Sequence, residues 1–564
     1  MKTREQKRIE GRLSQNLRGR KMITHLPSRG LIIVRPGNYV FAKDLVFDPP
    51  VEGKNNVDTI NAITIASSNV QINLNGFTLS QKVTPHHAFH LPLQKRFVVG
   101  IRVLDGVRNT VIRNGTIRGF ASVGVSAIKQ DRRNPAAIND LTLESLDLLR
   151  NGRTSNVNLP GFSSVAGGYA VGGGYFQPTP QDEEVLVQNK NIRIFNVNAS
   201  ENGPDYPQPF TPNQFIDAGT TTFCENVTIG NSQFNRNTST DFAVNGLFAS
   251  DCTNVLIKNC VGNGNRGVIE SIGILAAFIN KVTVEDCVAN RNIIGGSSNV
   301  QSGFSDSASA VGFAFEQDTS LTVRRCTAKF QVASFSAQRC TGSQCFVPFL
   351  ITRAHGFRFF RTKQALFENC IANGNILTAG GRTPSSAGEA AGYMFNGSRI
   401  TMRDCVAMNN RVILTSQPGF THGGFGFFLG LFVTDSGTFG QVRNPIFPLL
   451  FNVLYGRNIA RGNGWRLTNC KRITPGTPAS SGIYLQSNKG AVVNGATSSR
   501  NLGNGLRLDT GFVIVKRNSP PVEIPTTQSF ILNNRFIDNK CKGIKNTSHG
   551  RNVFFNNVVK NNGV

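Results

Sequence analysis

The chain reads GFRFFRTKQALFENCIAN from Gly356 to Asn373, and the same phrase recurs along its middle. Further copies begin at Gly273, Gly312 and Gly392, and each carries a Cys followed two residues later by Ala. An internal repeat outranks any local motif, because each copy is one supersecondary unit that packs on its neighbours. The repeat therefore decides the architecture before any residue is assigned a chemical role.

Within each copy the apolar residues alternate. Phe313 and Phe315 are two residues apart, as are Phe357 and Phe359. Alternation with a period of two predicts short strands that bury one face. Val, Ile, Phe, Thr and Asn are frequent here, which favours strands, and no sustained helical period is present. The repeat unit is therefore a set of short strands.

The spacing of the repeat predicts coils. Asn-Gly pairs such as Asn75-Gly76, Asn373-Gly374 and Asn504-Gly505 follow the strands and are expected at corners, where left-handed backbone angles are needed. The repeated cysteines lie 27, 39, 44 and 35 residues apart, and they are Cys260, Cys287, Cys326, Cys370 and Cys405. These intervals suit a turn of a little over twenty residues with insertions at one corner. Such a unit, with three short strands and three turns, predicts a parallel β-helix.

The N-terminal part carries the most specific motifs. They are PGNYVFAKDL (36–45), ITIASSNVQINLNGFTL (63–79) and DGVRNTVIRNGTIRGF (105–120). With these segments the chain resembles the right-handed parallel β-helix family, the pectin-lyase-like superfold. The resemblance covers about residues 30–564 and implies an all-β fold: one single-stranded solenoid domain of roughly thirteen coils. Residues 1–29 are expected to form a basic N-terminal arm or a short helix that caps the first coil.

The cysteines are predicted to be mostly reduced. Those at the repeat position would stack in an inward column, with neighbouring Cβ atoms about 4.8 Å apart, farther than the ~3.8 Å of a disulfide. A buried free Cys acts as a small apolar side chain. Cys340 and Cys345 lie in an insertion and could pair. We expect synthesis in a reducing compartment.

The formal net charge of +27 predicts an anionic partner. The candidates are an acidic glycan, nucleic acid, an anionic lipid surface, or an acidic capsid or assembly protein. The alternative is a repulsive surface that keeps the chain soluble. The N-terminal segment holds eight basic residues against Glu5 and Glu10. These predicted anion-binding residues are Lys2, Arg4, Lys7, Arg8, Arg12, Arg18, Arg20 and Lys21.

No segment has the pattern of a signal peptide or a membrane span. We therefore expect synthesis in the cytosol, with packaging in a virion as one outcome. An elongated chain with two blunt ends can also stack or form a homo-oligomer such as a trimer.

A catalytic site is not evident. The polygalacturonase and pectate-lyase motifs of the superfold are absent. The best catalytic candidates lie in the middle coils, where stacking would bring Asp318 and Glu316 near Arg361 and Lys363, with His355 close by. The alternative is a cross-coil ladder of ion pairs that stabilises the stack. No metal site or cofactor is predicted, because no His and carboxylate residues have tight ligand spacing.

The favoured hypothesis is a non-catalytic structural or adhesive β-helix protein. It would be a component of a virion or other surface assembly and would contact glycans or another anionic partner. The alternative is a polysaccharide lyase or glycoside hydrolase, and a third candidate is a nonspecific binder of nucleic acid or other anions. The enzyme question stays open at this point, leaning against catalysis, and the glycan interpretation rests on the resemblance of fold.

Overall fold

The computed structural model describes most of the chain in seventeen segments. They are residues 20–49, 60–82, 98–129, 134–152, 167–177, 183–203, 215–239, 243–296, 307–335, 351–379, 387–397, 399–414, 422–429, 452–465, 480–513, 522–548 and 550–563. Most of the expected basic arm and the pair Cys340 and Cys345 lie outside these segments. The chain divides into two compact units: Met1–Tyr206 with Thr220–Thr228, and Pro207–Gly219 with Ile229–Val564.

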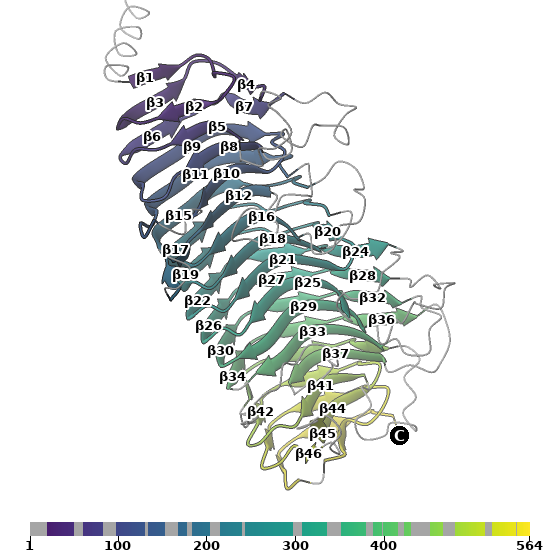
Figure 1. Cartoon of the computed structure of the whole chain (residues 1–564). Coiled ribbons are helices and arrows are strands. Elements are labelled where there is room, and N and C mark those ends of the chain that lie inside the picture. Colours follow the sequence, from purple (N-terminus) through teal and green to yellow (C-terminus); the bar gives the residue numbers. More distant parts are fainter. Residues whose placement is uncertain are drawn as a thin grey trace, which may run out of the picture. The chain divides into compact units, whose positions relative to one another are not determined.

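Unit 1 has two parallel sheets and one hairpin (Figure 1). One sheet contains β1 (Arg20–Ile23), β3 (Gly37–Phe41), β4 (Leu45–Phe47), β6 (Val70–Asn73), β7 (Thr78–Gln81), β9 (Arg108–Arg118), β11 (Asn139–Leu149) and β15 (Asn189–Asn198). The other contains β2 (Leu31–Ile33), β5 (Ile60–Ile65), β8 (Val98–Val103), β10 (Val123–Ile128) and β12 (Gly167–Gly172). The hairpin is β13 (Gly174–Phe176) with β14 (Val185–Val187). The strands that carry residues of both units are β16 (Phe215–Thr222) and β17 (Cys224–Gly230).

Unit 2 has four parallel sheets and one hairpin. Sheet 1 contains β19 (Thr253–Lys258), β22 (Lys281–Glu285), β26 (Ser320–Arg324), β30 (Gln364–Glu368), β34 (Ile400–Arg403), β38 (Val453–Tyr455), β42 (Val492–Asn494), β47 (Phe530–Leu532) and β50 (Val553–Phe555). Sheet 2 contains β18 (Ala243–Ser250), β21 (Glu270–Ala277), β25 (Ser307–Glu316), β29 (Ile351–Thr362), β33 (Ala387–Gly397), β37 (His422–Leu429), β41 (Ser481–Gln486), β44 (Asn504–Asp509) and β49 (Ile544–Asn546).

The two smaller sheets of unit 2 complete its coils. Sheet 3 contains β23 (Val288–Asn290), β27 (Thr327–Lys329), β31 (Ile371–Asn373), β35 (Val406–Met408), β39 (Ile459–Arg461), β43 (Thr497–Ser499), β48 (Arg535–Ile537) and β51 (Val558–Lys560). Sheet 4 contains β20 (Arg266–Gly267), β24 (Ile293–Gly296), β28 (Val332–Phe335), β32 (Ile376–Ala379), β36 (Arg411–Leu414) and β40 (Gly464–Trp465). The hairpin is β45 (Gly511–Val513) with β46 (Val522–Ile524).

Successive coils pair in parallel and in register. Val282 of β22 pairs with Leu321 of β26, which pairs with Ala365 of β30, and all three side chains are buried. From β21 to β40 the chain thus runs from sheet 2 to sheets 1, 3 and 4 and then returns to sheet 2 one coil further on. This is a parallel β-helix, as the repeat predicts. The described residues contain strands but no helix long and apolar enough to span a membrane.

Two details differ from the expected coil. The coils from β21 to β40 have four strands each instead of three, because a residue in the left-handed region, such as Asp286 (φ 56°), turns the chain between sheets 1 and 3. Extra residues fall mainly between a sheet 4 strand and the next sheet 2 strand, as expected for insertions at one corner, but residues 430–452 separate β37 from β38. The count of about thirteen coils and the N-terminal cap stay predictions.

The Asn-Gly pairs serve two purposes. Gly76 and Gly374 have positive φ angles and lie at corners, as expected. Asn504-Gly505 instead lies within β44, so the expectation that every such pair marks a corner is wrong. Gly505 belongs to a column of inward glycines on sheet 2. A Cβ at Gly392 of this column would approach the Ala407 Cβ to 2.8 Å and the Gly426 carbonyl oxygen to 2.8 Å, so a side chain has no room there.

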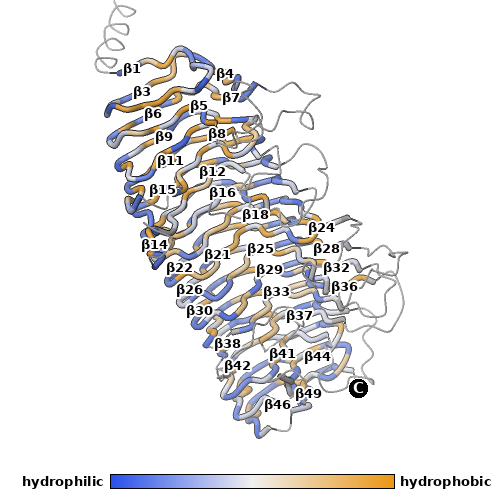
Figure 2. Tube along the Cα trace, in the orientation of Figure 1, coloured by the Kyte–Doolittle hydropathy of each residue, from blue (hydrophilic) through white to orange (hydrophobic). Residues whose placement is uncertain are grey.

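Aromatic rings stack along the interior of unit 2. The ring centroids of Phe313 and Phe357 are 4.9 Å apart, and Tyr393 continues the stack at 4.9 Å from Phe357. A second stack contains Phe359, whose ring also meets Phe367 of sheet 1 edge-on at 4.5 Å. Figure 2 shows the resulting alternation of hydrophobic and hydrophilic residues along the strands. The Gly-Phe-x-Phe repeat therefore supplies the core.

An amide ladder follows the corner before sheet 4. At most rungs the backbone N–H and the side-chain amide both donate to the amide oxygen of the next rung. For example, Asn410 donates to Asn463 Oδ1 at 3.1 and 2.8 Å. The rungs are Asn237, Asn265, Asn292, Gln331, Asn375, Asn410, Asn463, Asn501, Asn539 and Asn562. Buried amides need such partners, so the ladder satisfies most of them, Asn292 Nδ2 excepted, while fixing the register.

The repeat cysteines form the expected inward column. Cys260, Cys287, Cys326, Cys370 and Cys405 are buried free thiols. The thiol of Cys287 donates to the Glu285 carbonyl oxygen at 3.1 Å, which places the sulfur at the corner after sheet 1. Cys541, which is not one of the repeat cysteines, is disulfide-bonded and so differs from the expected reduced state.

Replacing Phe357 with Ala should lower the free energy of unfolding by about 3–5 kcal/mol, because the change opens a cavity between two stacked rings. Urea unfolding followed by circular dichroism measures the loss. Phe330, whose side chain is 45% exposed, is the matched control, and Phe330→Ala should cost less than about 1 kcal/mol. Equal losses for the two variants would contradict the inward stack.

Candidate functional site

Sheet 2 of unit 2 presents an outward face that carries several buried ionisable side chains, which are His355, Glu389, Arg507 and Asp509. Phe357 and Phe359 of β29 point into the interior, so Arg358 between them points outward. Arg358 pairs in register with Ala314 of β25 and Met394 of β33. Both neighbours belong to apolar clusters on this face, one around Val311 and the other containing Ala391, Phe425, Phe428 and Tyr484.

Arg358 holds two carboxylates from two preceding coils. Its Nη2 lies 3.0 Å from Glu270 Oε1 of β21 and 2.9 Å from Glu316 Oε1 of β25. We call these three residues the carboxylate–arginine cluster. The side chain of Glu316 is 32% exposed and that of Glu270 is 26% exposed, so water reaches both. Desolvation raises the pKa of Glu270, with Arg358 opposing and the charge of Glu316 adding to the rise.

His355 lies in a deeper group on the same face. Its Nε2 is 3.7 Å from Glu389 Oε2, and Arg353 Nε is 3.5 Å from the same oxygen. His355 and Glu389 are almost fully buried. Among the described residues, neither ring nitrogen of His355 has a hydrogen-bond partner. We call Arg353, His355 and Glu389 the histidine cluster.

Burial sets the protonation of this cluster. Desolvation lowers the pKa of His355 well below its usual range, and the charges of Arg353 and Arg358 lower it further. Desolvation raises the pKa of Glu389, while Arg353 opposes the rise. His355 is therefore neutral at neutral pH and cannot form a charged pair with Glu389.

A third buried group lies on the outward face nearer the C-terminal coils. Arg507 and Asp509 form an ion pair with no exposed side-chain surface, and the Tyr484 hydroxyl donates to Asp509 Oδ2 at 2.9 Å. Desolvation raises the pKa of Tyr484. Each charge here has a partner, as buried ions require, so the group needs no ligand to be stable.

Asp318, a catalytic candidate from the sequence, occupies a structural position. Its side chain is fully buried, and Oδ1 accepts the Ile279 backbone N–H at 2.9 Å. Asn452 accepts the N–H of Ile400 in the same way further along. Desolvation raises the pKa of Asp318 to about 8; the bond from Ile279 opposes this rise and Glu316 adds to it. At neutral pH Asp318 is therefore mainly protonated and resembles the asparagine of a ladder.

The other predicted residues are distributed around the same corner. Arg361 is exposed, with its guanidinium 4.9 Å from the centroid of the Phe360 ring. The Lys363 backbone N–H donates to the Asp318 carbonyl oxygen at 3.0 Å. Glu316 and His355 thus share the outward face, whereas Asp318 turns into the corner. A catalytic role for any of the five candidates stays a prediction.

Of the predicted anion-binding residues, the structure describes only Arg20 and Lys21. Arg20 is exposed on β1. Lys21 Nζ donates to the Pro36 carbonyl oxygen and the Tyr39 hydroxyl, both at 3.1 Å. Two of the hydrogen-bond donors of this ammonium group are therefore occupied within unit 1. The remaining six basic residues of the expected arm lie outside the described segments.

A cross-coil ladder of ion pairs is present on sheet 1. Charges alternate in sign on five consecutive strands, with the closest contact 2.8 Å between Arg324 Nε and Glu368 Oε2. The ladder consists of Lys258, Glu285, Arg324, Glu368 and Arg403. In the described segments, no group of three or more His, Cys, Asp or Glu residues could hold a metal ion.

The residues that sequence reasoning missed are Glu270 and Glu389. The sequence does contain a signal for them, because Glu270 and Glu389 each stand three residues before a repeat glycine, Gly273 and Gly392. Glu270 lies two coils before Arg358, and the intervening segment of variable length hides their proximity. When the repeats are aligned on their inward glycines, such as Gly273 and Gly356, Glu270 and Glu389 fall on the outward face.

The comparisons with known proteins agree with the fold. Residues 450–564 match the family described as "Right handed beta helix region". No curated protein matches the chain in sequence. Together with the parallel pairing of coils, the family match over residues 450–564 confirms the predicted fold, a right-handed parallel β-helix.

Several solved structures are similar over most of their length. The A-module of the Azotobacter vinelandii mannuronan C-5 epimerase AlgE4 is 10% identical, covers 92% of this chain and 91% of its own, and has a TM-score of 0.27. A tailspike protein of E. coli bacteriophage HK620 in complex with a pentasaccharide is 10% identical, with coverages of 88% and 72% and a TM-score of 0.29. The Streptococcus pneumoniae surface adhesin PfbA is 9% identical, with coverages of 87% and 91% and a TM-score of 0.21.

Replacing Asp318 with Asn should stabilise the protein at pH 8 by up to a few kcal/mol and leave it unchanged near pH 4. The folded pKa of about 8 exceeds the ordinary value of 3.8, so the parent loses stability as pH rises between these values, and Asn does not titrate. Urea unfolding across this pH range measures the gap. Asp286→Asn is the control with the opposite sign, because Arg325 lowers the pKa of Asp286. A gap independent of pH would contradict a protonated Asp318.

Replacing Arg358 with Met should lower the free energy of unfolding by about 2–4 kcal/mol at pH 8, because two carboxylates lose their shared partner. The loss should shrink at pH 5, where the carboxylates of the variant take up protons. Arg325→Met removes the exposed pair with Asp286 and should cost less than about 1 kcal/mol. If both arginine variants lost the same small amount of unfolding free energy, the result would contradict a role of the carboxylate–arginine cluster in holding the coils together.

Proposed function

We propose that this chain is a non-catalytic structural or adhesive β-helix protein, a component of a virion or other surface assembly that contacts an acidic glycan or another anionic partner. The carboxylate–arginine cluster carries the proposal. Arg358 joins Glu270 and Glu316 from two other coils, so the charges of the outward face hold the stack together. A hydrolase needs instead one carboxylic acid and one carboxylate that face a substrate.

The interior supports the same proposal. The stacked rings around Phe357 and the amide ladder through Asn410 link each coil of unit 2 to the next with paired buried groups. Repetition of this kind suits a durable scaffold, because stability accumulates from coil to coil. The charge of +27 supplies the attraction to an anionic partner.

A polysaccharide lyase or glycoside hydrolase is the second candidate, and one observation favours it. Glu270 and Glu316 contact the same nitrogen, so their oxygens lie no farther apart than the sum of those two distances. This separation fits the short carboxylate spacing of retaining glycosidases. The raised pKa of Glu270 would suit a general acid. Catalysis would require Arg358 to leave the space between the carboxylates.

Retention on immobilised acidic and neutral polysaccharides, combined with an assay for cleavage, tests the proposal. We expect the chain to bind heparin, alginate and pectate columns, to elute at rising salt, and to pass through a neutral dextran column. Electrostatic binding weakens steeply with ionic strength, which explains the salt elution. No new reducing ends and no unsaturated products should appear during long incubation.

Each other outcome selects another function. Cleavage that is abolished by Glu270→Gln and retained by Asp286→Gln would support the glycosidase candidate. Retention on double-stranded DNA that exceeds retention on every glycan would support the nucleic-acid binder. Absence of retention on all anionic columns would contradict an anionic partner.

A further inference from the structure

The corner between sheets 3 and 4 of unit 2 carries one positive charge in almost every coil. A rung of the amide ladder marks this corner, and three positions surround each rung, two before it and one after it. Over the eight successive rungs from Asn237 to Asn501, seven have one basic residue at these positions. We call these residues the basic edge, and they are Arg236, Arg266, Arg291, Lys329, Arg411, Arg461 and Arg500.

The basic edge is open to solvent and continues from coil to coil. Six of its side chains are exposed, and Lys329 is half-buried. Lys329 and Arg461 end strands of sheet 3, Arg411 begins a strand of sheet 4, and Arg291 (φ 55°) turns the chain between these sheets. The sheet 4 strands β24, β28, β32 and β36 lie side by side (Figure 1). With about 4.8 Å between stacked strands, the eight rungs span about 34 Å.

The basic edge has no acidic partner within the stack. In the described residues, the three positions around these eight rungs hold no Asp or Glu. Arg236 apart, none of the seven side chains forms an ion pair in the part of the chain that the structure describes. Arg411 donates instead to neutral oxygens, the Gly462 carbonyl at 3.2 Å and Asn409 Oδ1 at 3.3 Å. Stacked charges of one sign repel, so an anion that lies along the edge relieves this repulsion.

The one coil without a charge at this corner offers groups of another kind. Its three positions hold Asn373, Gly374 and Ile376. The ring of Phe330 covers Gly374, because a Cβ there would lie 2.8 Å from the ring atoms Cδ1 and Cε1, and Phe330 is 45% exposed. An exposed ring and an amide beside a row of cations can contact the apolar face and the hydroxyl groups of a sugar.

The spacing of the charges selects the partner. Duplex DNA carries one negative charge per about 1.7 Å of its axis, nearly three times the density of one cation per coil of about 4.8 Å. Single-stranded nucleic acid is held by several aromatic rings that stack on its bases. Among the positions of this edge in the described residues, Phe330 is the only aromatic residue. A linear polysaccharide with one carboxylate per sugar residue fits this sparse row of charges better.

We propose that the basic edge is the surface on which this chain binds an acidic polysaccharide, which lies across successive coils with its carboxylates against the guanidinium groups. The inference rests on the proposed function and adds where the anionic partner binds and how its charges are spaced. The outward face of sheet 2, where Arg358 is already held by Glu270 and Glu316, is then not the binding surface.

Fluorescence anisotropy of the full chain with fluorescein-labelled pectate oligosaccharides tests the proposal. Arg461 and Arg500 occupy neighbouring coils, since Arg461 pairs in register with Ser499. Arg461→Gln combined with Arg500→Gln should weaken binding about tenfold at low salt and reduce its salt dependence, because two close charge contacts are lost.

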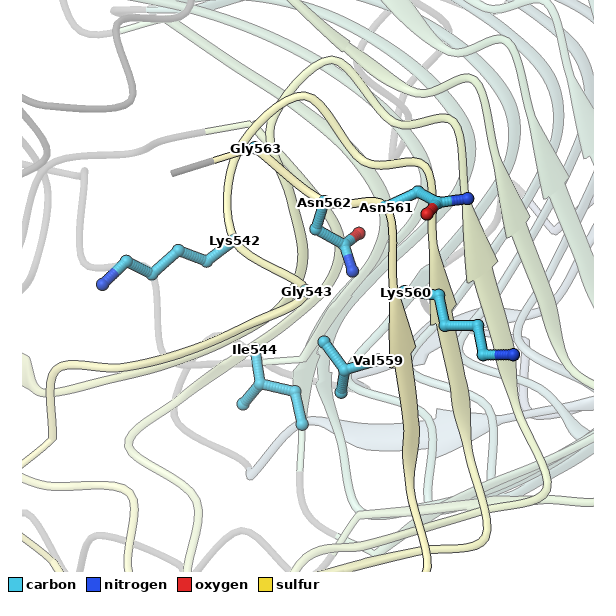
Figure 3. A pocket seen from close by; sticks show the side chains of 8 residues that line it. All are labelled: Lys542, Gly543, Ile544, Val559, Lys560, Asn561, Asn562 and Gly563. Atoms are coloured by element: carbon cyan, nitrogen blue, oxygen red, sulfur yellow. The ribbon is translucent and has the colours of Figure 1, made fainter.

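A matched control removes two exposed lysines of unit 2 that lie away from the edge. Lys281 begins β22 on sheet 1. Lys542 flanks a pocket, and its side chain extends away from Lys560, which occupies the same sheet 3 position as Arg461 (Figure 3). Lys281→Gln combined with Lys542→Gln removes the same total charge, so it should weaken binding less than about twofold.

A gain of binding tests the same edge without loss of a native charge. Asn373→Lys places a cation at the uncharged rung, one coil after Lys329, and should tighten binding about threefold. Asn494→Lys adds the same charge on sheet 1 and should change binding much less.

The outcomes separate this inference from the proposed function. Equal weakening by the two double variants, or equal effects of Asn373→Lys and Asn494→Lys, would overturn the basic edge as the binding surface but leave polysaccharide binding intact. A parent chain that binds no acidic polysaccharide would contradict both. Tighter binding of single-stranded DNA, lost in the Arg461 and Arg500 double variant, would overturn polysaccharide as the occupant.

Discussion

In-register hydrogen bonding between parallel coils is the constraint on which the other features depend. Because Val282, Leu321 and Ala365 pair directly, each side chain of one coil lies above the equivalent side chain of the next. Any residue type that repeats at one position therefore becomes a column along the sheet. The stacked phenylalanines, the amide ladder, the thiols and the inward glycines are all consequences of this single pairing rule.

The same rule determines what charged residues can do. On sheet 1 the side chains stacked at one position alternate between positive and negative charge from strand to strand. Arg324 therefore contacts Glu285 on one neighbouring strand and Glu368 on the other. On the outward face of sheet 2, Arg358 neutralises carboxylates from two coils. Stacking also brings Asp318 to a buried corner, where burial keeps it protonated at neutral pH. Charges in this fold thus act first on their neighbours in the stack, and ligands must compete with those contacts.

Much of the fold could be predicted from the repeat, and less of the candidate site. Gly356, Phe357 and Phe359 fall where their alternation places them, because burial of one face follows directly from a period of two. The sequence groups Asp318 with Glu316 because both come soon after Phe315, but Glu316 ends β25 and the turn after it takes Asp318 into different surroundings. Glu270 was missed, since sequence distance does not report proximity across coils.

By itself the sequence determined the parallel β-helix, its inward aromatic and cysteine columns, and its large positive charge, because repetition and composition are properties of the chain. Only the tertiary structure decided which charges meet, since that depends on the register between coils and on insertions of unequal length.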